Sequence, residues 1–335
     1  MPITPKAHKG RGAVSSPNGR FARQQVMLDA AEAALANADA PETILTAMRA
    51  GKIISHNNSP DVPFNRSINP YQGCEHGCIY CYARPSHSYM DLSPGIDFET
   101  RLFYKPNAAA RLLEEWARPG YACEPITIGA NTDPYQPAEK KTTVTRQLLK
   151  LFKKHRHPVN LITKGTLISR DMDLLAWLAE RNLCSVAISV PTLDPALKRI
   201  MEPRVPSARS RLKLIQELAA NGVPVSVLVA PVIPAINDAE IEKIIEAVST
   251  AGARHASYIF LRLPHEVRGL FIEWLETHFP DRAKHVMSLV KQASGGKDYD
   301  NRFGIRQRGR GPYADMLASR FRAACSRHSL SLIHI

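Results

Sequence analysis

Short apolar runs alternate with amphipathic stretches along much of the chain, most regularly between residues 125 and 278. Runs of about four to eight apolar residues predict buried strands, and apolar positions spaced three and four apart predict helices. The predicted strands are 64–70, 125–130, 159–163, 184–190, 224–230 and 255–261. The predicted helices are 107–116, 142–155, 171–181, 194–200, 209–221, 238–250, 266–278 and 312–325.

Six strand–helix units in succession predict an α/β fold with a parallel sheet and crossover helices. We expect side-chain caps at Asn107 and at Asn237 or Asp238, because their oxygens can accept from the free amides of a first helical turn. In barrels built from such units, functional residues follow the carboxyl ends of the strands. Polar residues just after each predicted strand are therefore candidates for function.

The chain divides by composition into three regions. Residues 1–55 predict a basic, partly flexible extension, residues 56–280 hold the strand–helix units of the core, and residues 281–335 predict a covering segment and tail. The covering segment includes the helix at 312–325, which could close the open side of a six-stranded barrel. Its last residues, 329–335, show no periodicity.

Within the amino-terminal extension, residues 9–13 (Lys-Gly-Arg-Gly-Ala) predict a flexible basic segment. Residues 26–36 and 41–50 are short alanine-rich patterns that predict helices. Nothing catalytic is recognisable there, although a basic segment could contact a nucleic-acid backbone.

The chain is basic, with 44 Lys and Arg against 31 Asp and Glu and a formal net charge of +13. The basic residues concentrate in 6–23, in 198–213 and in 302–310 with Arg320, Arg322 and Arg327. This distribution favours a polyanionic partner such as nucleic acid, although it also fits a solvated basic surface.

The sequence predicts a cytoplasmic protein without membrane contact. The amino terminus is charged and has no apolar leader. The most apolar run, 223–236, is too short for a membrane span and contains prolines. We expect a monomer.

Three of the six cysteines, Cys74, Cys78 and Cys81, form a C-x3-C-x2-C motif. Only a loop lets thiolates at this spacing converge on one inorganic centre, and Gly73 and Gly77 give the backbone that freedom. Thiolate is the ligand of zinc and of iron–sulfur clusters. A four-iron cluster held by three cysteines would leave one iron open to a small molecule.

Two simpler interpretations use the same cysteines. They could be part of a zinc site with His76 or His87 as fourth ligand, but no second C-x2-C pair follows. Cys78 and Cys81 alone could be a redox pair. That interpretation leaves Cys74 unexplained, and no thioredoxin-like pattern surrounds the motif.

The cysteine motif, with Tyr80 at its aromatic position, resembles that of the radical SAM enzymes. The resemblance extends over about residues 55–325 and points to an uncharacterised bacterial group related to spore photoproduct lyase. It implies a partial (β/α)6 TIM-type barrel. It also implies a [4Fe-4S] cluster on Cys74, Cys78 and Cys81, S-adenosyl-L-methionine (SAM) on the open iron, and Tyr80 beside the SAM adenine.

Polar residues lie at the carboxyl ends of three predicted strands. Asn131, Thr132 and Asp133 come after the second strand, Lys164 comes after the third, and Ser189 is near the end of the fourth. The resemblance implies that Thr132 and Asp133 contact the methionine part of SAM, at the barrel mouth with Asn131. It likewise implies that Lys164 binds the SAM carboxylate and Ser189 the ribose. The simpler alternatives are a capped turn, an exposed lysine and a core serine bonded to backbone.

The sequence departs from spore photoproduct lyase at one position. Ala130 stands where the lyase carries a cysteine that donates a hydrogen atom to the substrate radical. Cys123 and Cys184 begin strands, at the wrong end of a barrel, so Cys325 or a tyrosine such as Tyr258 could donate instead. Photoproduct repair by the lyase route is therefore not the expected activity.

Together these features predict a radical SAM enzyme. The resemblance implies reductive cleavage of SAM to a 5′-deoxyadenosyl radical, which abstracts hydrogen from an unknown substrate, with a nucleic-acid base as the leading candidate. It also implies an electron donor such as flavodoxin or ferredoxin. The alternative is a nucleic-acid-binding iron–sulfur or zinc protein without turnover.

Overall fold

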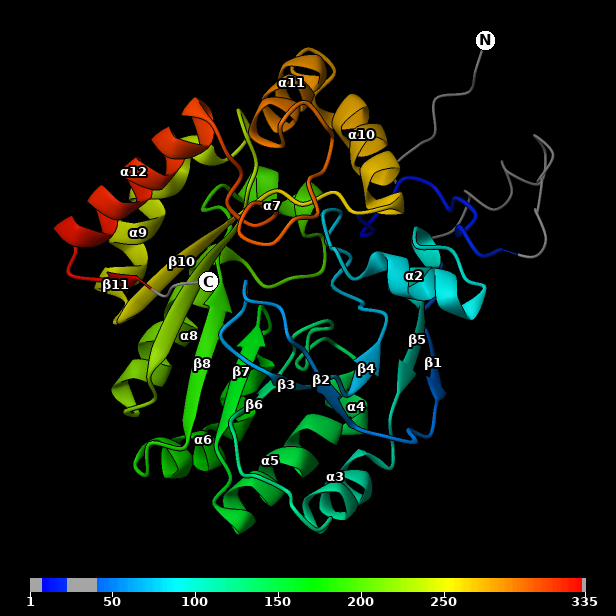
Figure 1. The fold of residues 1–335 in the computed structure, drawn as a ribbon, viewed down its shortest axis with the longest axis vertical. Helices are drawn as coiled ribbons and strands as arrows, with labels where there is room; N and C mark the ends of the chain where they lie inside the picture. The colour runs from blue at the N-terminus through cyan, green and yellow to red at the C-terminus, as the bar shows by residue number, and fades with distance from the viewer. Residues whose placement is uncertain (1–7, 23–40, 333–335) are drawn as a thin grey trace.

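The computed structural model describes residues 8–22 and 41–332, and its centre is an eight-stranded sheet (Figure 1). In spatial order the strands are β11 (Ser331–Leu332), β10 (His255–Phe260), β9 (Val225–Val232), β8 (Cys184–Ser189), β7 (Val159–Thr163), β6 (Ile126–Ile128), β3 (Arg66–Ile68) and β2 (Ile54–His56). Neighbours from β3 to β11 pair in parallel, and β2 pairs with β3 antiparallel. Within the described residues the two edge strands do not pair with each other, so the sheet is an open, partial barrel.

The two faces of the sheet have different environments because side chains alternate along a strand. In β8, Val186 and Ile188 are fully buried in the apolar core on the outer face. Ser185, Ala187 and Ser189 point the other way and line a cavity on the inner face. The period-two pattern thus separates a packed face from a face that is available for binding.

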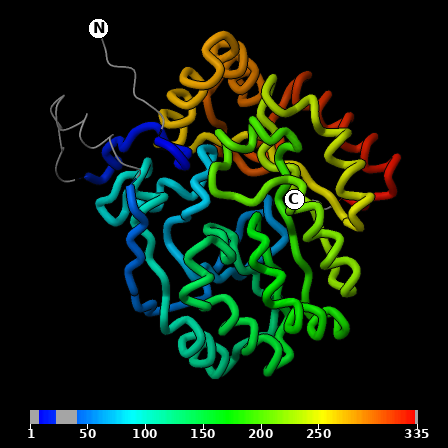
Figure 2. The backbone as a smooth tube through the Cα atoms, turned by 180° about the vertical axis from the view of Figure 1, so that it is seen from behind, coloured from blue at the N-terminus to red at the C-terminus, as the bar shows by residue number. Residues whose placement is uncertain are grey.

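Helices cover the outer face, and in the view from behind they lie in front of the strands (Figure 2). The crossover helices with their short companions are α4 (Glu139–Thr142), α5 (Val144–His155), η2 (Thr166–Asp171), α6 (Met172–Ala179), α7 (Pro195–Met201), α8 (Ala208–Ala220), η3 (Asp238–Glu240) and α9 (Ile241–Thr250). Each longer helix buries an apolar stripe; α5, for example, buries Leu148, Leu149 and Phe152.

A three-stranded sheet stands beside the main one, in the order β1-β5-β4. It consists of β1 (Ile44–Ala47), β5 (Arg101–Tyr104) and β4 (Tyr71–Gln72). β5 is preceded by η1 (Arg84–Met90) and α2 (Ile96–Thr100), and followed by α3 (Ala108–Trp116). Because β4 ends at Gln72, this sheet fixes the chain immediately before the cysteine motif.

A second apolar cluster lies above the sheet and joins distant parts of the chain. It contains the buried ring of Trp274 on α10 (Glu266–His278) and residues of α11 (Ala283–Ala293). Ile79 of the cysteine loop and Val14 of the amino-terminal segment belong to the same cluster. The carboxyl-terminal helices therefore pack against the loop that carries the cysteines.

The six predicted strands and the helices between them are confirmed, most within two residues at each end, and 159–163 and 266–278 agree with β7 and α10. The helix at 41–50 and the two predicted helix caps are wrong, and two elements were not predicted. Residues 41–50 contain strand β1, because β-branched Thr43, Ile44 and Thr46 allow pairing with β5. Helix α11 was not predicted, and residues 331–332 form strand β11. Asn107 does not cap α3, because its side chain bonds to the backbone of Ala50. Neither Asn237 nor Asp238 caps the helix that follows, because the Asn237 side chain accepts from the Ile233 amide at 2.6 Å and donates to the carbonyls of Pro191 and Pro231.

The carboxyl-terminal helix α12 (Pro312–Arg327) does not close the open side of the barrel. It packs against α9 and α11 and continues the outer layer (Figure 1). The preceding loop instead supplies Arg306 and Gln307 to the cavity wall. The helix predicted at 26–36 lies outside the described residues, and the domain boundaries after residues 55 and 280 stay predictions. No described helix is long and apolar enough to cross a membrane.

Candidate functional site

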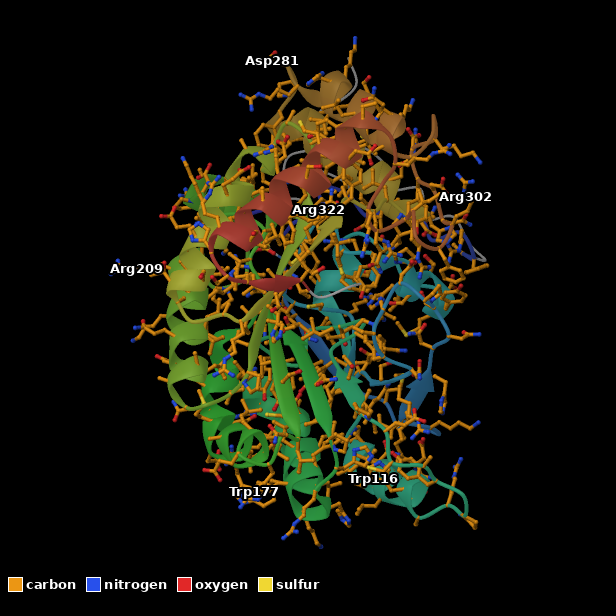
Figure 3. The ribbon with its side chains drawn as sticks, turned by 60° about the vertical axis from the view of Figure 1, so that its left-hand side comes forward. Trp116, Trp177, Arg209, Asp281, Arg302 and Arg322 are labelled. Carbon is orange, nitrogen blue, oxygen red and sulfur yellow. The ribbon has the colours of Figure 1, made fainter. Side chains whose placement is uncertain are left out.

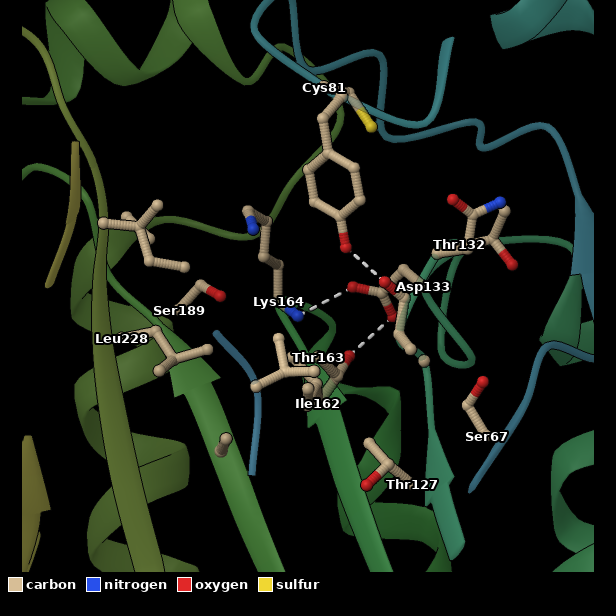
Figure 4. A pocket seen from close by; sticks show the side chains of 18 of the residues that line it. Ser67, Cys81, Thr127, Thr132, Asp133, Ile162, Thr163, Lys164, Ser189 and Leu228 are labelled. Atoms are coloured by element: carbon tan, nitrogen blue, oxygen red, sulfur yellow. Dashed lines mark hydrogen bonds between the residues drawn. The ribbon is translucent and has the colours of Figure 1, made fainter. Parts of the chain in front are cut away.

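A cavity of about 660 Å³ lies on the inner face of the sheet, around the carboxyl ends of β6 to β10 (Figure 4). Its lining includes every residue that the sequence singled out for cluster or SAM binding: Cys74, Cys78, Tyr80, Cys81, Asn131, Thr132, Asp133, Lys164 and Ser189. These residues come from four separate segments of the chain, so only the fold brings them together. Their binding roles remain predictions.

The cysteine loop is shaped by two glycines with positive φ, Gly73 at 75° and Gly77 at 67°. A Cβ atom at Gly73 would come within 3.0 Å of Leu102, His87 and the carbonyl of Phe98. The loop is tied down by the amide of Cys74, which donates to that carbonyl at 2.9 Å. Glycine is therefore required at this turn for both its conformation and its small size.

All three cysteines of the motif are free thiols, with Cys74 and Cys78 less than 9% exposed and Cys81 partly exposed. Burial raises the pKa of all three thiols, most strongly at Cys74 and Cys78. Buried thiolates need a cationic centre to stabilise them. The chemistry of the loop thus favours a bound metal centre over free thiolates.

The arrangement fits an iron–sulfur cluster better than a single zinc ion. Zinc–sulfur bonds of about 2.3 Å bring all ligands of one ion close together. The described residues contain no group of three or more His, Cys, Asp or Glu side chains that could hold one metal ion. A cluster places each thiolate on a different iron and tolerates wider spacing. His87, one proposed zinc ligand, does not line the cavity and bonds to the carbonyl of Arg101 at 2.9 Å.

A fully buried ion pair holds the cysteine loop from below. Arg84 donates to the carbonyls of Cys78 at 3.0 Å and Gly77 at 3.3 Å, and it pairs with Glu99 at 2.5 Å. Neither side chain of the pair is exposed to solvent. No sequence pattern singles out Glu99, whereas Arg84 lies three residues after the last cysteine of the motif.

The amino-terminal segment, residues 8–22, packs onto the same loop, beside α2 and α10 (Figure 2). The amides of Gly12 and Ala13 donate to the Glu99 carboxylate at 3.0 and 2.8 Å, and Arg11 donates to the Glu99 carbonyl at 2.9 Å. A Cβ atom at Gly12 would lie 1.8 Å from the Gly77 carbonyl oxygen. The prediction that 9–13 is a flexible basic segment is therefore wrong for Arg11, Gly12 and Ala13, which are buried.

Tyr80 is held by a buried chain of polar groups. Its hydroxyl donates to Glu202, and Glu202 pairs with Arg211 at 2.8 Å. Arg211 also donates to the carbonyl of Ser189 at 2.8 Å. Burial alone would raise the pKa of Glu202, but Arg211 and Lys164 outweigh it and lower the pKa. Sequence reasoning assigned no role to Glu202, and the structure shows that it links the cysteine loop to the end of β8.

Asp133 joins the ends of β6 and β7 (Figure 4). Its carboxylate accepts from the Thr163 hydroxyl at 2.6 Å and from the Lys164 amide at 2.7 Å, and His76 Nδ1 lies 3.4 Å away. Burial by itself raises the pKa of Asp133, but His76 and these donors outweigh it, and the pKa falls to about 2. The hydroxyl of Thr132 donates to the carbonyl of Tyr71 at 2.9 Å. Both side chains thus hold the cavity wall in place.

Lys164 extends from the end of β7 into the cavity, with its ammonium 5.9 Å from the centre of the Tyr80 ring. No carboxylate in the described residues lies within 4 Å of this ammonium. Asn131 also lines the cavity, and its backbone amide donates to the side-chain oxygen of Asn69 at 2.8 Å. Lys164 is therefore a cation that remains available to a ligand carboxylate.

Neither residue suggested as a hydrogen-atom donor lines the cavity. Cys325 is buried in α12, and the ring of Tyr258 packs against Phe321 at 4.9 Å on the outer side of the sheet. The tyrosines that line the cavity are Tyr80 and Tyr82. The hydroxyl of Tyr82 donates to the carbonyl of Ala130.

The open parallel sheet and its cavity define a partial α/β barrel protein with three free cysteines at the carboxyl ends of the strands. The chain belongs to the radical SAM superfamily, whose family model matches residues 68–248. It is accordingly a radical SAM enzyme, and members of this family use an iron–sulfur cluster and SAM.

The chain is also similar to uncharacterized proteins of other organisms. An uncharacterized protein of Mycobacterium tuberculosis strain H37Rv is 36% identical over 237 residues, which is 70% of each chain. An uncharacterized protein of Methanocaldococcus jannaschii is 29% identical over 173 residues, covering 52% of this chain and 62% of that one.

Solved structures show the same fold. A mutant of spore photoproduct lyase superposes with a TM-score of 0.63 at 14% identity, covering 94% of this chain and 88% of that one. Another mutant, with bound AdoMet and dinucleoside spore photoproduct, gives a TM-score of 0.61 at 14% identity, covering 86% and 80%.

Proposed function

We propose that this protein is a radical SAM enzyme that removes a hydrogen atom from a nucleic-acid base. Cys74, Cys78 and Cys81 would hold a [4Fe-4S] cluster, and SAM would occupy the cavity beside it. The bound cluster and SAM would supply a 5′-deoxyadenosyl radical after one-electron reduction. The observation that carries the proposal is that the three thiols share one cavity with all six residues predicted to contact SAM.

The residues of the chain bind and orient the cofactor in this proposal. Lys164 offers an unpaired ammonium to the SAM carboxylate, and Tyr80 offers an aromatic face to the adenine. Ser189 offers a hydroxyl to the ribose. Asp133 holds Lys164 in place by accepting a hydrogen bond from the Lys164 backbone amide. The other carboxylate oxygen of Asp133 accepts from the Thr163 hydroxyl and the Tyr135 amide.

The substrate class is supported by charge and by a structural neighbour. The net charge of +13 favours a polyanion. Spore photoproduct lyase, which shares the fold, has been solved in complex with dinucleoside spore photoproduct. We further propose that the chain works as a monomer with flavodoxin or ferredoxin as electron donor.

Formation of 5′-deoxyadenosine tests the proposal. The full chain, reconstituted with iron and sulfide without oxygen, is expected to hold about four irons. Strong reduction in the presence of SAM is expected to produce 5′-deoxyadenosine, measured by chromatography. Bound zinc, or a reduced cluster that never cleaves SAM, would contradict it and favour a binding protein without turnover.

Replacing Lys164 by methionine is expected to weaken SAM binding about ten- to a hundredfold, because a hydrogen bond between charged groups contributes about 1.5–3 kcal/mol. Equilibrium dialysis with the reconstituted protein measures the change. Lys164→Arg keeps the charge and should lose less. Lys213→Gln is the matched control, since the Lys213 side chain is 76% exposed. Equal SAM affinity in Lys164→Met and the wild type would exclude the proposed contact.

A further inference from the structure

Two polar side chains in the cavity wall have groups without a protein partner. Arg262 lies two residues after the end of β10, and Gln307 lies in the loop before α12; both line the cavity. Arg262 Nε and Gln307 Oε1 are buried, and neither has a hydrogen-bond partner among the described residues. Gln307 is only 4% exposed. A buried polar group without a partner is costly, so both are suited to a ligand.

The charge of Arg262 is also not neutralised by the protein. Its guanidinium lies 5.1 Å from the centre of the Tyr82 ring and donates to the Tyr299 hydroxyl at 3.3 Å. In the described part of the chain, no carboxylate pairs with it. Its neighbour Arg306, by contrast, pairs with Asp61. Arg262 is therefore a cation aimed into the cavity that is suited to an anionic group.

Two loops meet beside the cavity, and the one before α12 carries arginines and an exposed aromatic ring. Asp61, 5% exposed, accepts from the Gly304 amide at 2.6 Å and from Arg306. Next to this junction Phe303 is 57% exposed, with the Arg306 guanidinium 4.5 Å from its ring centre. Arg302 is exposed on the same loop, where it pairs with Asp300 at 2.5 Å (Figure 3). Exposed aromatic rings among arginines are typical of surfaces that bind single-stranded nucleic acid.

We infer that Arg262 and Gln307 bind the substrate itself: Arg262 a phosphate of a nucleic-acid strand, and Gln307 the edge of a base held in the cavity. This inference rests on the proposed function, and it deepens that proposal by naming specificity-determining residues. A guanidinium can make two parallel hydrogen bonds to a phosphate. A glutamine amide offers one donor face and one acceptor, which matches the edge of a base.

The inference is tested by fluorescence anisotropy with a short fluorescein-labelled oligothymidylate and the full reconstituted chain, between about 50 and 200 mM salt. Arg262→Gln is expected to weaken binding about tenfold and to reduce the slope of log affinity against log salt by about 0.7, the value of one phosphate contact on a single strand. Arg262→Lys should keep the slope but recover only part of the affinity, because an ammonium cannot bind in the same two-point manner.

The matched control is Arg181→Gln, which removes the same charge at the other end of the strands. Arg181 precedes β8, and its guanidinium lies 4.0 Å from the ring centre of Trp177. A competing thymidine dinucleotide with a normal phosphodiester should displace the probe from the wild type better than its uncharged methylphosphonate analogue. Arg262→Gln should remove that difference. Urea unfolding of each variant checks that the fold is intact.

Several results would overturn the inference. The wild type could fail to bind the oligonucleotide at low salt, or Arg262→Gln could show the same affinity and salt slope as the wild type. A third such result is displacement of the probe by a peptide with a free carboxylate but not by the dinucleotide. A loss of SAM affinity in Arg262→Gln with unchanged oligonucleotide binding would make Arg262 a cofactor residue instead. Because the binding measurement needs no SAM cleavage, failure of the inference and failure of the proposed function are seen separately.

Discussion

Replacing Cys78 by alanine is expected to abolish both the iron content and the formation of 5′-deoxyadenosine. The three thiols of the motif are the cysteines that line the cavity, and the other three lie elsewhere in the described structure. No spare thiol can therefore take the place of Cys78. The folded chain should persist, because the Cys78 side chain packs in an apolar cluster where alanine removes only one sulfur atom.

The measurement is iron per chain after anaerobic reconstitution, followed by chromatography of the reduced reaction with SAM. Cys123→Ala is the matched control, since Cys123 is an exposed thiol outside the cavity and should behave like the wild type. Continued SAM cleavage by the Cys78 variant would contradict the assignment of the cluster ligands.

Replacing Glu99 by glutamine is expected to lower the free energy of unfolding by about 3–5 kcal/mol, because it leaves the Arg84 guanidinium buried without its counter-charge. The same carboxylate accepts from the amides of Gly12 and Ala13, and a glutamine amide cannot satisfy all of these donors with its single oxygen. Arg84 also positions the carbonyls of Gly77 and Cys78. Iron retention should therefore fall together with stability.

Urea unfolding of the chain without metal measures the stability, and iron per chain measures the second effect. Glu114→Gln is the matched control: it breaks an exposed pair with Arg111, whose side chains are 53% and 36% exposed, and should cost less than about 1 kcal/mol. Similar losses of unfolding free energy in the two variants would show that the buried Arg84–Glu99 pair stabilises the chain no more than an exposed pair.

The core of the fold could be predicted from the sequence because its signals are local. Strand β7 and helix α10 have clear periodicity, and their bounds follow from it. The cavity residues could also be predicted, since Lys164 and Asp133 come shortly after predicted strands. Helix α11 also has a local signal, because its buried Ala283, Val286, Val290 and Ala293 are spaced three and four apart.

Other features could not be predicted because they depend on distant partners. Arg11 and Glu99 are 88 positions apart, and nothing near either residue indicates that they meet. The glycines and arginine of 9–13 have the composition of a flexible segment, and only the buried carboxylate makes them rigid. The partners of Tyr80 are similarly remote, since Glu202 lies 122 positions away. The short strands β1 and β4 form only through such long-range pairing.

The packing of residues 11–14 against the cysteine loop affects when, during synthesis and folding, a metal can reach the cysteines. The ribosome must add Glu99 before Gly12 and Ala13, which are made earlier, can donate to its carboxylate. Until then the cysteines lie on a chain without its amino-terminal cover, and docking must close a loop of 88 positions. Delivery of iron during synthesis would meet an accessible loop, whereas delivery to the finished molecule would require that cover to lift or the metal to enter through the cavity mouth.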